Sequence, residues 1–296
     1  MRIDQLLVHI QLASTRSQAK RLIAGGVEWR QGDSWRRVAK NGDDVPEDAA
    51  VRLLDDAEAR YVSRGGLKLE AALKHLGLDV TGFACLDVGQ STGGFTDCLL
   101  QHGAMSVVGV DVGSAQLHPQ LRTDPRVLCV EKVNARALVA DDLVAAYQDS
   151  VGADGMFDDD DVAVDFGDCL AAEDETSADS DPSVRRFAPA FDLVVADLSF
   201  ISQTLVLPAV VPLLKAGGSL LTLVKPQFEL QPGQVGKGGI VKDPSMYLLV
   251  EQRVRDACAD LGLKVTAWFD SPITGGDGNR EFFICAHKPG ETALSE

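Results

Sequence analysis

One segment of sixteen residues constrains the fold of this chain more than any other. It reads CLDVGQSTGGFTDCLL, runs from Cys85 to Leu100, and joins an apolar stretch containing Asp87 to a glycine-rich loop and a second apolar stretch. Glycines let a backbone pass close to a ligand, and a helix N-terminus offers free N–H groups. The segment therefore predicts a buried strand, a ligand-binding loop and a helix that opens near Phe95.

After residue 67 the chain alternates between short apolar stretches and stretches with helical spacing. Strands are expected at residues 84–88, 107–112, 127–130, 192–196, 219–224 and 282–287. Helices are expected at 68–76, from the glycine-rich loop through 102, near 204–214 and at 244–261. This alternation is typical of a doubly wound, mostly parallel α/β sheet.

The first 54 residues predict a separate small unit. Helical spacing is present at 4–10 and at 16–24, the second with Ser14 as a candidate cap. Short strands are expected at 27–30 and 51–54, with turns at 31–34 and 41–44. Residues 1–40 hold eight Lys and Arg against three acids. A basic unit suits contacts with phosphates, although a charge run is usually only a solvated face.

The charge of the whole chain is misleading. A formal charge of −16, taken alone, argues against a partner as acidic as a nucleic acid. Thirteen of the acids fall between residues 149 and 184, a stretch with no Lys or Arg. Such a stretch cannot bury enough apolar surface to fold, so we expect a disordered acidic insertion at 149–184. The acidic total therefore hides a basic N-terminus.

Several classes of protein are disfavoured by what the sequence lacks. The N-terminus has no long apolar core of a signal peptide, and the longest charge-free stretch, 198–214, contains two prolines and is short for a membrane span. The six cysteines include no C-x-x-C pair, and the five histidines have no metal-like spacing. We expect a cytoplasmic protein with no stable membrane association and no metal site.

A second acid favours a nucleoside ligand. Asp111 ends the next expected strand, 22 residues after Gly89, where a carboxylate can accept hydrogen bonds from a ribose diol. A tight turn with no ligand is the plainer interpretation of the loop, and a dinucleotide is a rival ligand. The loop lacks the G-x-G-x-x-G pattern that is typical of dinucleotide sites.

Four charged residues are expected at one edge of the sheet. Asp197 and Lys225 each follow an apolar strand, and Lys68 and Glu281 lie in SRGGLKL and GNREFF. Open α/β sheets bind ligands at the carboxyl ends of their strands. Buried charges are costly unless they are paired, so two lysines and two acids gathered there would neutralise one another. Each residue alone is equally well explained as a solvated strand end, which is a poorer explanation for four together.

The order of the motifs resembles a known family. Residues 1–29 resemble an S4 RNA-binding domain of the αL type, and the remainder resembles the FtsJ-like RNA 2'-O-ribose methyltransferases, which have a Rossmann-like sheet. The motifs YVSRGGLKL, DVGQSTGGFTD, VDVG, DLSFIS, LVKPQFE, GKGGIVKD and SPITGGDGN together are similar to the TlyA family, whose members also carry the name haemolysin. The stretch 149–184 and EWRQGD at 28–33 depart from the family pattern.

The resemblance implies an enzyme that uses S-adenosyl-L-methionine to methylate a ribose 2'-OH, of cytidine, in ribosomal RNA. The family's catalytic Lys-Asp-Lys-Glu set falls on Lys68, Asp197, Lys225 and Glu281. The residues implied to contact the cofactor are Asp87, Gly89, Ser91, Thr92, Gly93, Gly94, Phe95, Asp111, Val112 and Asp197. Those expected to contact RNA are Arg2, Arg16, Lys20, Arg21, Arg30 and Arg64. The implied partners are ribosomal RNA and ribosomal subunits, and not DNA.

The expected domain boundaries follow from the same motifs. An S4-like domain is expected at 1–58, a linker at 59–64 and an FtsJ-like methyltransferase domain at 65–291. Two other function classes stay open. One is a ribosome-binding or assembly factor that keeps the fold without the activity, against which the intact set of four charged residues argues. The other is a membrane-lytic haemolysin, which the missing signal peptide and membrane span disfavour.

Overall fold

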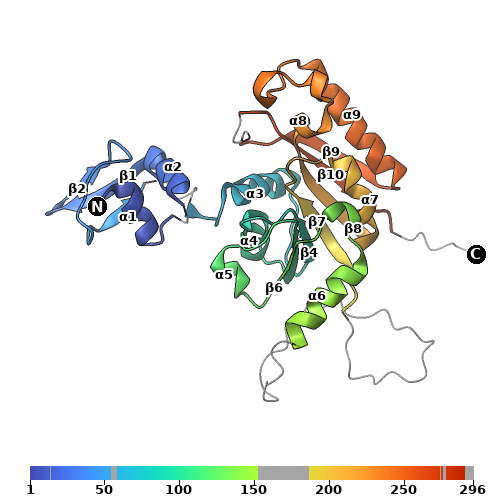
Figure 1. Cartoon of the computed structure of the whole chain (residues 1–296), viewed down its shortest axis with the longest axis horizontal. Helices are drawn as coiled ribbons and strands as arrows, with labels where there is room; N and C mark the ends of the chain where they lie inside the picture. The colour runs from blue at the N-terminus through green and yellow to red at the C-terminus, as the bar shows by residue number, and fades with distance from the viewer. Residues whose placement is uncertain (14, 55–58, 153–186, 274, 276–277, 291–296) are drawn as a thin grey trace, which may run out of the picture.

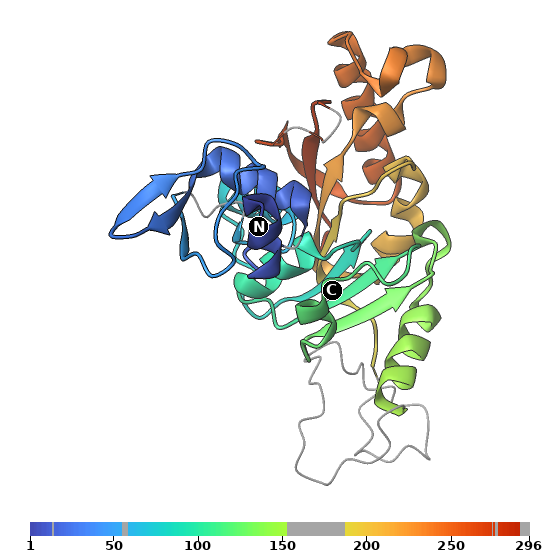
Figure 2. The same cartoon turned by 60° about the vertical axis from the view of Figure 1, so that its left-hand side comes forward.

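The computed structural model describes residues 1–13, 15–54, 59–152, 187–273, 275 and 278–290. It contains a small N-terminal unit and a larger α/β unit, joined by residues 59–63 ahead of helix α3 (Arg64–Leu76) (Figure 1). A second view shows the small unit beside the part of the large unit that carries α3 (Figure 2). The Gln18 side chain donates a hydrogen bond to the Tyr61 carbonyl at 3.4 Å, which ties the small unit to the joining segment.

A seven-stranded sheet forms the centre of the large unit, with the strand order β6-β5-β4-β7-β8-β10-β9. Its strands are β4 (Ala84–Val88), β5 (Ser106–Asp111), β6 (Val127–Glu131), β7 (Phe191–Ala196), β8 (Leu214–Val224), β9 (Lys264–Asp270) and β10 (Phe282–His287). Neighbouring strands are parallel except at β10, which runs antiparallel to both β8 and β9. The strand order reverses between β4 and β7, and a crevice at the carboxyl ends of two such strands is where open α/β sheets bind ligands.

Helices cover both faces of this sheet, because successive residues of a strand point to opposite faces. On one face α3, α4 (Gly94–Gln101) and α5 (Pro119–Arg122) share a core with Cys85 of β4 and Leu193 of β7. On the other face α6 (Ala140–Gly152), α7 (Leu207–Val210) and α9 (Ser245–Asp260) share a core with the next residues, Leu86 and Val194. The predicted doubly wound α/β fold is therefore confirmed as a three-layer arrangement (Figure 1).

The N-terminal unit packs two helices on a small antiparallel sheet. Its elements are α1 (Ile3–His9), α2 (Arg16–Gly26), β1 (Val27–Gln31), β2 (Ser34–Arg37) and β3 (Val51–Leu53), with the strand order β2-β1-β3. Its core contains the fully buried Ile3, Leu6 and Leu22. The N-terminal cap of α2 is Thr15, whose side chain accepts a hydrogen bond from the Gln18 N–H at 3.2 Å. The expected cap, Ser14, lies outside the described residues.

The structure differs from the sequence-based expectation in several places. The helix expected near 204–214 is wrong: the chain forms a 3-10 turn (Gln203–Leu205), then α7, then another 3-10 turn (Val211–Leu213), and β8 begins at residue 214. Pro208 is the second residue of α7, and Pro212 is the second residue of the last 3-10 turn. A proline has no N–H to continue a helix that precedes it, so the segment is divided into short elements. Strands β2 and β9 are absent from the sequence-based expectation, and both lie at sheet edges where no run of buried residues marks them.

The acidic stretch is only partly described. Helix α6 continues through Gly152, so residues 149–152 of the expected insertion are helical, and residues 153–184 lie outside the described residues. The remaining short elements are α8 (Pro226–Glu229) and 3-10 turns at Ala135–Ala137, Pro232–Gln234 and Lys237–Gly239. Among the helices that the structure describes, none is long and apolar enough to cross a membrane.

Candidate active site

The glycine-rich loop after β4 is shaped by two positions that need glycine. Gly93 caps α4 with a φ of 95°, and a Cβ added there would lie 2.4 Å from Cδ1 of Leu121. A Cβ added at Gly94 would lie 2.1 Å from Oγ of Ser63, just before α3. Glycine alone allows both the left-handed backbone and the close approach. The loop is therefore enclosed between α3, α4 and α5, the layer on one face of the sheet.

Asp87 of β4 has one carboxylate oxygen engaged and one without a partner. Its Oδ2 accepts hydrogen bonds from the Thr96 N–H at 3.0 Å and from the Thr96 hydroxyl at 2.7 Å. Its Oδ1 is buried and has no hydrogen-bond partner among the described residues. Burial raises the pKa of Asp87 to about 7, although the hydrogen bonds from Thr96 act in the opposite direction. A buried acceptor of this kind suits a ligand that brings its own donor.

Asp87 faces a small pocket that also contains a charged pair. The pocket has a volume of about 180 Å³ and is lined by Asp87, Gly89, Gly94, Asp197 and Lys225 among others. A larger neighbouring pocket of about 480 Å³ shares Gly89 and Asp197 with it, as well as Ser91 and Ser199. The shared walls show that the two pockets are parts of one cleft above the carboxyl ends of β4 and β7.

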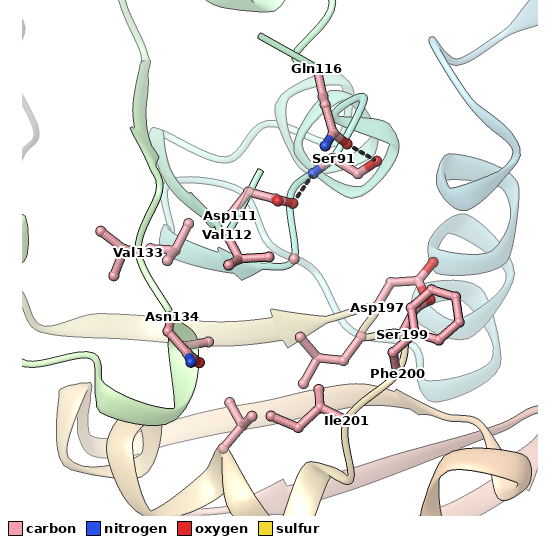
Figure 3. Close-up of a pocket in the computed structure, with 15 residues that line it drawn as sticks. Ser91, Asp111, Val112, Gln116, Val133, Asn134, Asp197, Ser199, Phe200 and Ile201 are labelled. Carbon is pink, nitrogen blue, oxygen red and sulfur yellow. Dashed lines mark hydrogen bonds between the residues drawn. The ribbon is translucent and has the colours of Figure 1, made fainter. Parts of the chain in front are cut away.

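The larger pocket is built around Asp111, the last residue of β5. Its Oδ2 accepts a hydrogen bond from the Ser91 N–H at 2.8 Å, and its Oδ1 accepts one from the Gly113 N–H at 2.7 Å. Figure 3 shows Asp111 and Ser91 on one side of this pocket and Ser199 and Phe200 on the other. A carboxylate offers about four acceptor sites, so Asp111 can still accept hydrogen bonds from a diol.

The four expected charged residues form two ion pairs. Lys225 Nζ lies 2.6 Å from Asp197 Oδ1, and Lys68 Nζ lies 2.5 Å from Glu281 Oε2. Each of these side chains keeps at most 24% of its surface exposed. The pairing is what burial demands, because a lone charge taken out of water is strongly disfavoured.

Strand register explains why these residues meet. Ala196 of β7 pairs with Thr222 of β8, and Val224 pairs with Phe282 of β10. Asp197, Lys225 and Glu281 adjoin these strand ends, so neighbouring strands bring them to one edge of the sheet. Lys68 reaches its partner from α3, across 213 residues of sequence. The Lys225–Asp197 pair lines the small pocket, whereas Lys68 and Glu281 line neither pocket and are almost completely covered.

Of the residues predicted to contact a cofactor, all except Gly93 line this cleft. Those lining the small pocket are Asp87, Gly89, Ser91, Thr92, Gly94, Phe95 and Asp197. Those lining the larger pocket are Gly89, Ser91, Asp111, Val112 and Asp197. Gly93 acts on the shape of the loop instead, because it holds the left-handed turn at which α4 begins.

Sequence reasoning missed two further walls of the larger pocket. One is formed by Val133, Asn134 and Ala135, which follow β6, and the other by Leu198, Ser199, Phe200 and Ile201, which follow β7 (Figure 3). Both segments come directly after strands, so the rule that ligands bind at strand ends would have indicated them. Gln116, which accepts a hydrogen bond from the Ser91 hydroxyl at 3.3 Å, carried no such signal.

Phe200 is the most exposed large apolar side chain of the site. It is 90% exposed, its φ is 65°, and its ring lies 5.2 Å from that of Phe228 on α8. A left-handed backbone is strained for an aromatic residue, and such strain is concentrated at functional sites. An aromatic face presented to solvent at the mouth of a cleft suits stacking on a flat ligand.

The residues expected to contact RNA have mixed surroundings. Arg2 and Arg16 each form an ion pair with the buried Asp4, at 3.0 Å in both cases, and thereby stabilise the helical part of the N-terminal unit. Lys20 and Arg30 are exposed. Arg21 is half-buried on α2, and Arg64 is half-buried at the start of α3 with its Nε covered.

Comparison with known proteins establishes the family. The model of the FtsJ-like methyltransferase family matches residues 61–288, which contain the whole cleft. This chain is an FtsJ-like methyltransferase. The 16S/23S rRNA (cytidine-2'-O)-methyltransferase TlyA of Mycobacterium tuberculosis is 36% identical over 294 residues, which are 99% of this chain and 92% of that protein. The chain therefore belongs to the TlyA group of the FtsJ-like methyltransferases, and the expected family is confirmed.

Two further relatives carry the other name of the group. Hemolysin A of Brachyspira hyodysenteriae is 32% identical over 282 residues, covering 95% of this chain and 98% of that protein. A solved structure described as a hemolysin from Streptococcus thermophilus has a TM-score of 0.64 and 35% identity, and it covers 100% of this chain and 92% of that chain. These matches extend over the N-terminal unit as well as the methyltransferase unit.

Proposed function

We propose that this FtsJ-like methyltransferase transfers a methyl group from S-adenosyl-L-methionine to a ribose 2'-OH of ribosomal RNA, on cytidine. The observation that carries the proposal is the cleft itself. Asp111, which can accept hydrogen bonds from a ribose diol, lies at one end of the cleft. At the other end lies Asp87 Oδ1, a buried acceptor with no partner among the described residues, and the Lys225–Asp197 pair lies beside it. The name of the TlyA relative supports rRNA and cytidine as the substrate.

The residues of the cleft fit the cofactor. Asp87 Oδ1 would accept a hydrogen bond from the ammonium group of the methionine part, which supplies the donor that this buried oxygen lacks. Asp111 would accept the two ribose hydroxyls, and Val133, Leu198 and Ile201 would contact the apolar faces of the adenine. When bound, S-adenosylmethionine supplies an electrophilic methyl group on a sulfonium sulfur. We propose that the other residues predicted to contact the cofactor line its binding site in the same cleft.

Lys225 is the residue that we place at the acceptor hydroxyl. Methyl transfer is an in-line displacement, so the 2'-oxygen must be held about 3 Å from the methyl carbon and must lose its proton. Asp197 holds the Lys225 amine at 2.6 Å, and both residues line the pocket that Asp87 also lines. In this scheme Lys225 first releases a proton to solvent and then orients the hydroxyl and receives its proton. The covered Lys68–Glu281 pair supports the strand ends next to it.

The RNA would lie across both units. We assign residues 1–58 to an S4-like RNA-binding domain, 59–64 to a linker and 65–291 to the methyltransferase domain. Exposed Lys20 and Arg30 are the best placed of the expected residues for phosphate contacts, and exposed Phe200 would stack on a base at the cleft. A ribosomal substrate places the enzyme in the cytoplasm with ribosomal subunits as partners.

A pair of lysine variants tests this function. Purified protein is incubated with ribosomal subunits that lack the modification and with S-adenosylmethionine labelled in the methyl group. Lys225→Ala should lower single-turnover transfer by about 10²–10⁴ because it removes the group that handles the proton. Its binding of S-adenosylhomocysteine should change little, because the cofactor is held mainly by other residues.

Lys215→Ala is the matched control. Lys215 lies at the start of β8, the strand that Lys225 directly follows. It pairs with Asp192 of β7 at 3.0 Å, at the opposite end of these strands from the cleft. This control should keep the wild-type rate. Equal rates for Lys225→Ala and Lys215→Ala would remove Lys225 from the reaction, and a wild-type protein that labels no ribosomal RNA would refute the proposed function.

A further inference from the structure

Within the part of the chain that the structure describes, Asp197 and Ser199 contact the Lys225 amine, and they act on it differently. Asp197 Oδ1 lies 2.6 Å from Nζ as an ion pair, and the Ser199 hydroxyl accepts a hydrogen bond from Nζ at 2.9 Å. An ammonium group is a compact charge with three rotating donors, so an ion pair fixes its place and leaves its rotation free. A directional hydrogen bond to a hydroxyl fixes the rotation about the Cε–Nζ bond.

The hydroxyl of Ser199 is not required for the packing of the protein core, because the residue is exposed. Ser199 is exposed, and it lines both parts of the cleft. Exposed serines are usually replaced by alanine at little cost in stability. The hydroxyl of Ser199 contacts the amine that we place at the substrate.

The backbone around Ser199 is held in an unfavourable shape. The next residue, Phe200, has a φ of 65°. A strained residue persists only where its surroundings over-determine it. Contacts with the rest of the fold must therefore hold residues 199–203 in this conformation.

These contacts are buried hydrogen bonds from Ser202 and Gln203 to the segment that carries Lys225. The Ser202 hydroxyl and the Gln203 N–H donate to the Glu229 carboxylate at 2.5 and 2.8 Å, and the Gln203 amide donates to the Leu223 carbonyl at 2.5 Å. Glu229 is 2% exposed and ends α8, four residues after Lys225. These contacts fix the loop that bears Ser199 relative to the strand end that bears Lys225.

We propose that Ser199 is a positioning residue that orients the Lys225 amine toward the acceptor hydroxyl. The inference rests on the proposed function, in which Lys225 meets that hydroxyl. Before transfer the ammonium releases one proton to solvent, and its nitrogen then has four directions: the Cε bond, two N–H bonds and the lone pair. With one N–H directed at Ser199 and Asp197 holding the amine in place, the lone pair faces the pocket. The bond from the ribose oxygen to the methyl carbon then forms as the carbon–sulfur bond breaks, and the hydroxyl proton passes to the lone pair.

Two variants of Ser199 test this role in the full-length protein. Rates are measured with ribosomal subunits at saturating S-adenosylmethionine, and KM is measured for both substrates. Ser199→Ala should lower kcat by about tenfold to a hundredfold, because a misdirected group loses much of the benefit of proximity. Its KM values and its melting temperature should match those of the wild type. Ser199→Thr keeps the hydroxyl and should restore most of the rate.

Ser150→Ala is the control for loss of an exposed serine hydroxyl. Ser150 lies on α6 and donates a hydrogen bond to the Tyr147 carbonyl at 2.7 Å, away from the cleft. It should show the wild-type kcat. A wild-type kcat in Ser199→Ala would overturn the proposal, as would equal losses in Ser199→Ala and Ser199→Thr, or a change confined to the KM for S-adenosylmethionine. Absence of transfer by the wild-type protein would instead refute the function on which the proposal rests.

Discussion

Replacing Asp87 with asparagine should stabilise the ligand-free protein at neutral pH and weaken cofactor binding. The carboxyl group is fully buried beside Asp197 and Asp111, and burial raises its pKa from an ordinary value of 3.8 to about 7. Between these two values the folded protein holds a proton that the unfolded chain has lost. The stability that this proton confers is complete below pH 3.8 and is lost as the pH rises through 7.

The size of the effect follows from the shift. Each pKa unit corresponds to about 1.4 kcal/mol, so a carboxyl shifted by about three units costs the folded state about 4 kcal/mol once it is ionised. Asparagine removes this cost. Its amide nitrogen would occupy the place of the unpartnered Oδ1, and an unsatisfied buried amide costs about 1–3 kcal/mol at every pH. The free energy of unfolding of the variant minus that of the wild type should therefore rise by about 3 kcal/mol between pH 5 and pH 8.

Urea unfolding of the ligand-free proteins over this pH range measures the gain. Asp79→Asn is the control, because Asp79 is exposed and hydrogen bonds from Thr81 lower its pKa, so its contribution changes only as the pH falls below 3.8. Calorimetry with S-adenosylhomocysteine should show affinity about ten- to a hundredfold lower for Asp87→Asn, through loss of a charge-assisted hydrogen bond. A stability difference that stays constant from pH 5 to pH 8 would refute the assignment of a buried, readily protonated Asp87.

Three other substitutions give separate expectations. Asp111→Ala should weaken binding of S-adenosylhomocysteine by about tenfold or more in calorimetry while RNA affinity holds, because it removes the acceptor of the ribose hydroxyls; an unchanged dissociation constant would contradict this. Glu281→Gln should lower the free energy of unfolding by about 3–5 kcal/mol in urea titrations, because it leaves the buried Lys68 without its counter-charge. Asp4→Asn should destabilise the N-terminal unit by about 1–3 kcal/mol, because two arginines lose a charged acceptor. The two arginines also lower the pKa of Asp4 below 3.8, so this loss should shrink only as the pH falls below 3.8, which melts at pH 7 and at a series of values below 3.8 check.

The sequence is most informative where a buried strand ends in a polar residue. The strands expected at 84–88 and 282–287 have the same bounds in the structure. Those expected at 127–130 and 192–196 are one residue longer at one end, and the one expected at 107–112 is shifted by one residue, to 106–111. An apolar stretch followed by a charged residue marks both the end of a strand and the edge of the sheet where ligands bind. For this reason the sequence alone places Asp111 and Asp197 at one edge. Strand β8 begins at residue 214, five residues before its expected start. Residues 215–217 are exposed or half-buried, so the apolar run does not mark this part of the strand.

The missed features depend on contacts between distant parts of the chain. The sequence predicts that the four charged residues neutralise one another but not which lysine pairs with which acid. The pairing of Lys68 with Glu281 requires α3 to pack near the start of β10, which no local pattern encodes. The edge strand β9 has only exposed and half-buried residues, so it lacks the apolar run by which inner strands are found. A basic stretch likewise does not reveal that Arg2 and Arg16 share a buried acid. Their part in binding RNA, and that of the other expected residues, stays a prediction.

If the cleft methylates a ribose oxygen of cytidine in ribosomal RNA, the methyl label must be found in one particular nucleoside. Ribosomal subunits lacking the modification are treated with the protein and S-adenosylmethionine labelled in the methyl group. The RNA is then digested to nucleosides, which are separated and identified by mass. We expect label in 2'-O-methylcytidine for the wild-type protein and a loss of that label for Lys225→Ala. Label in a nucleoside methylated on its base, or in no nucleoside of the RNA, would contradict this expectation.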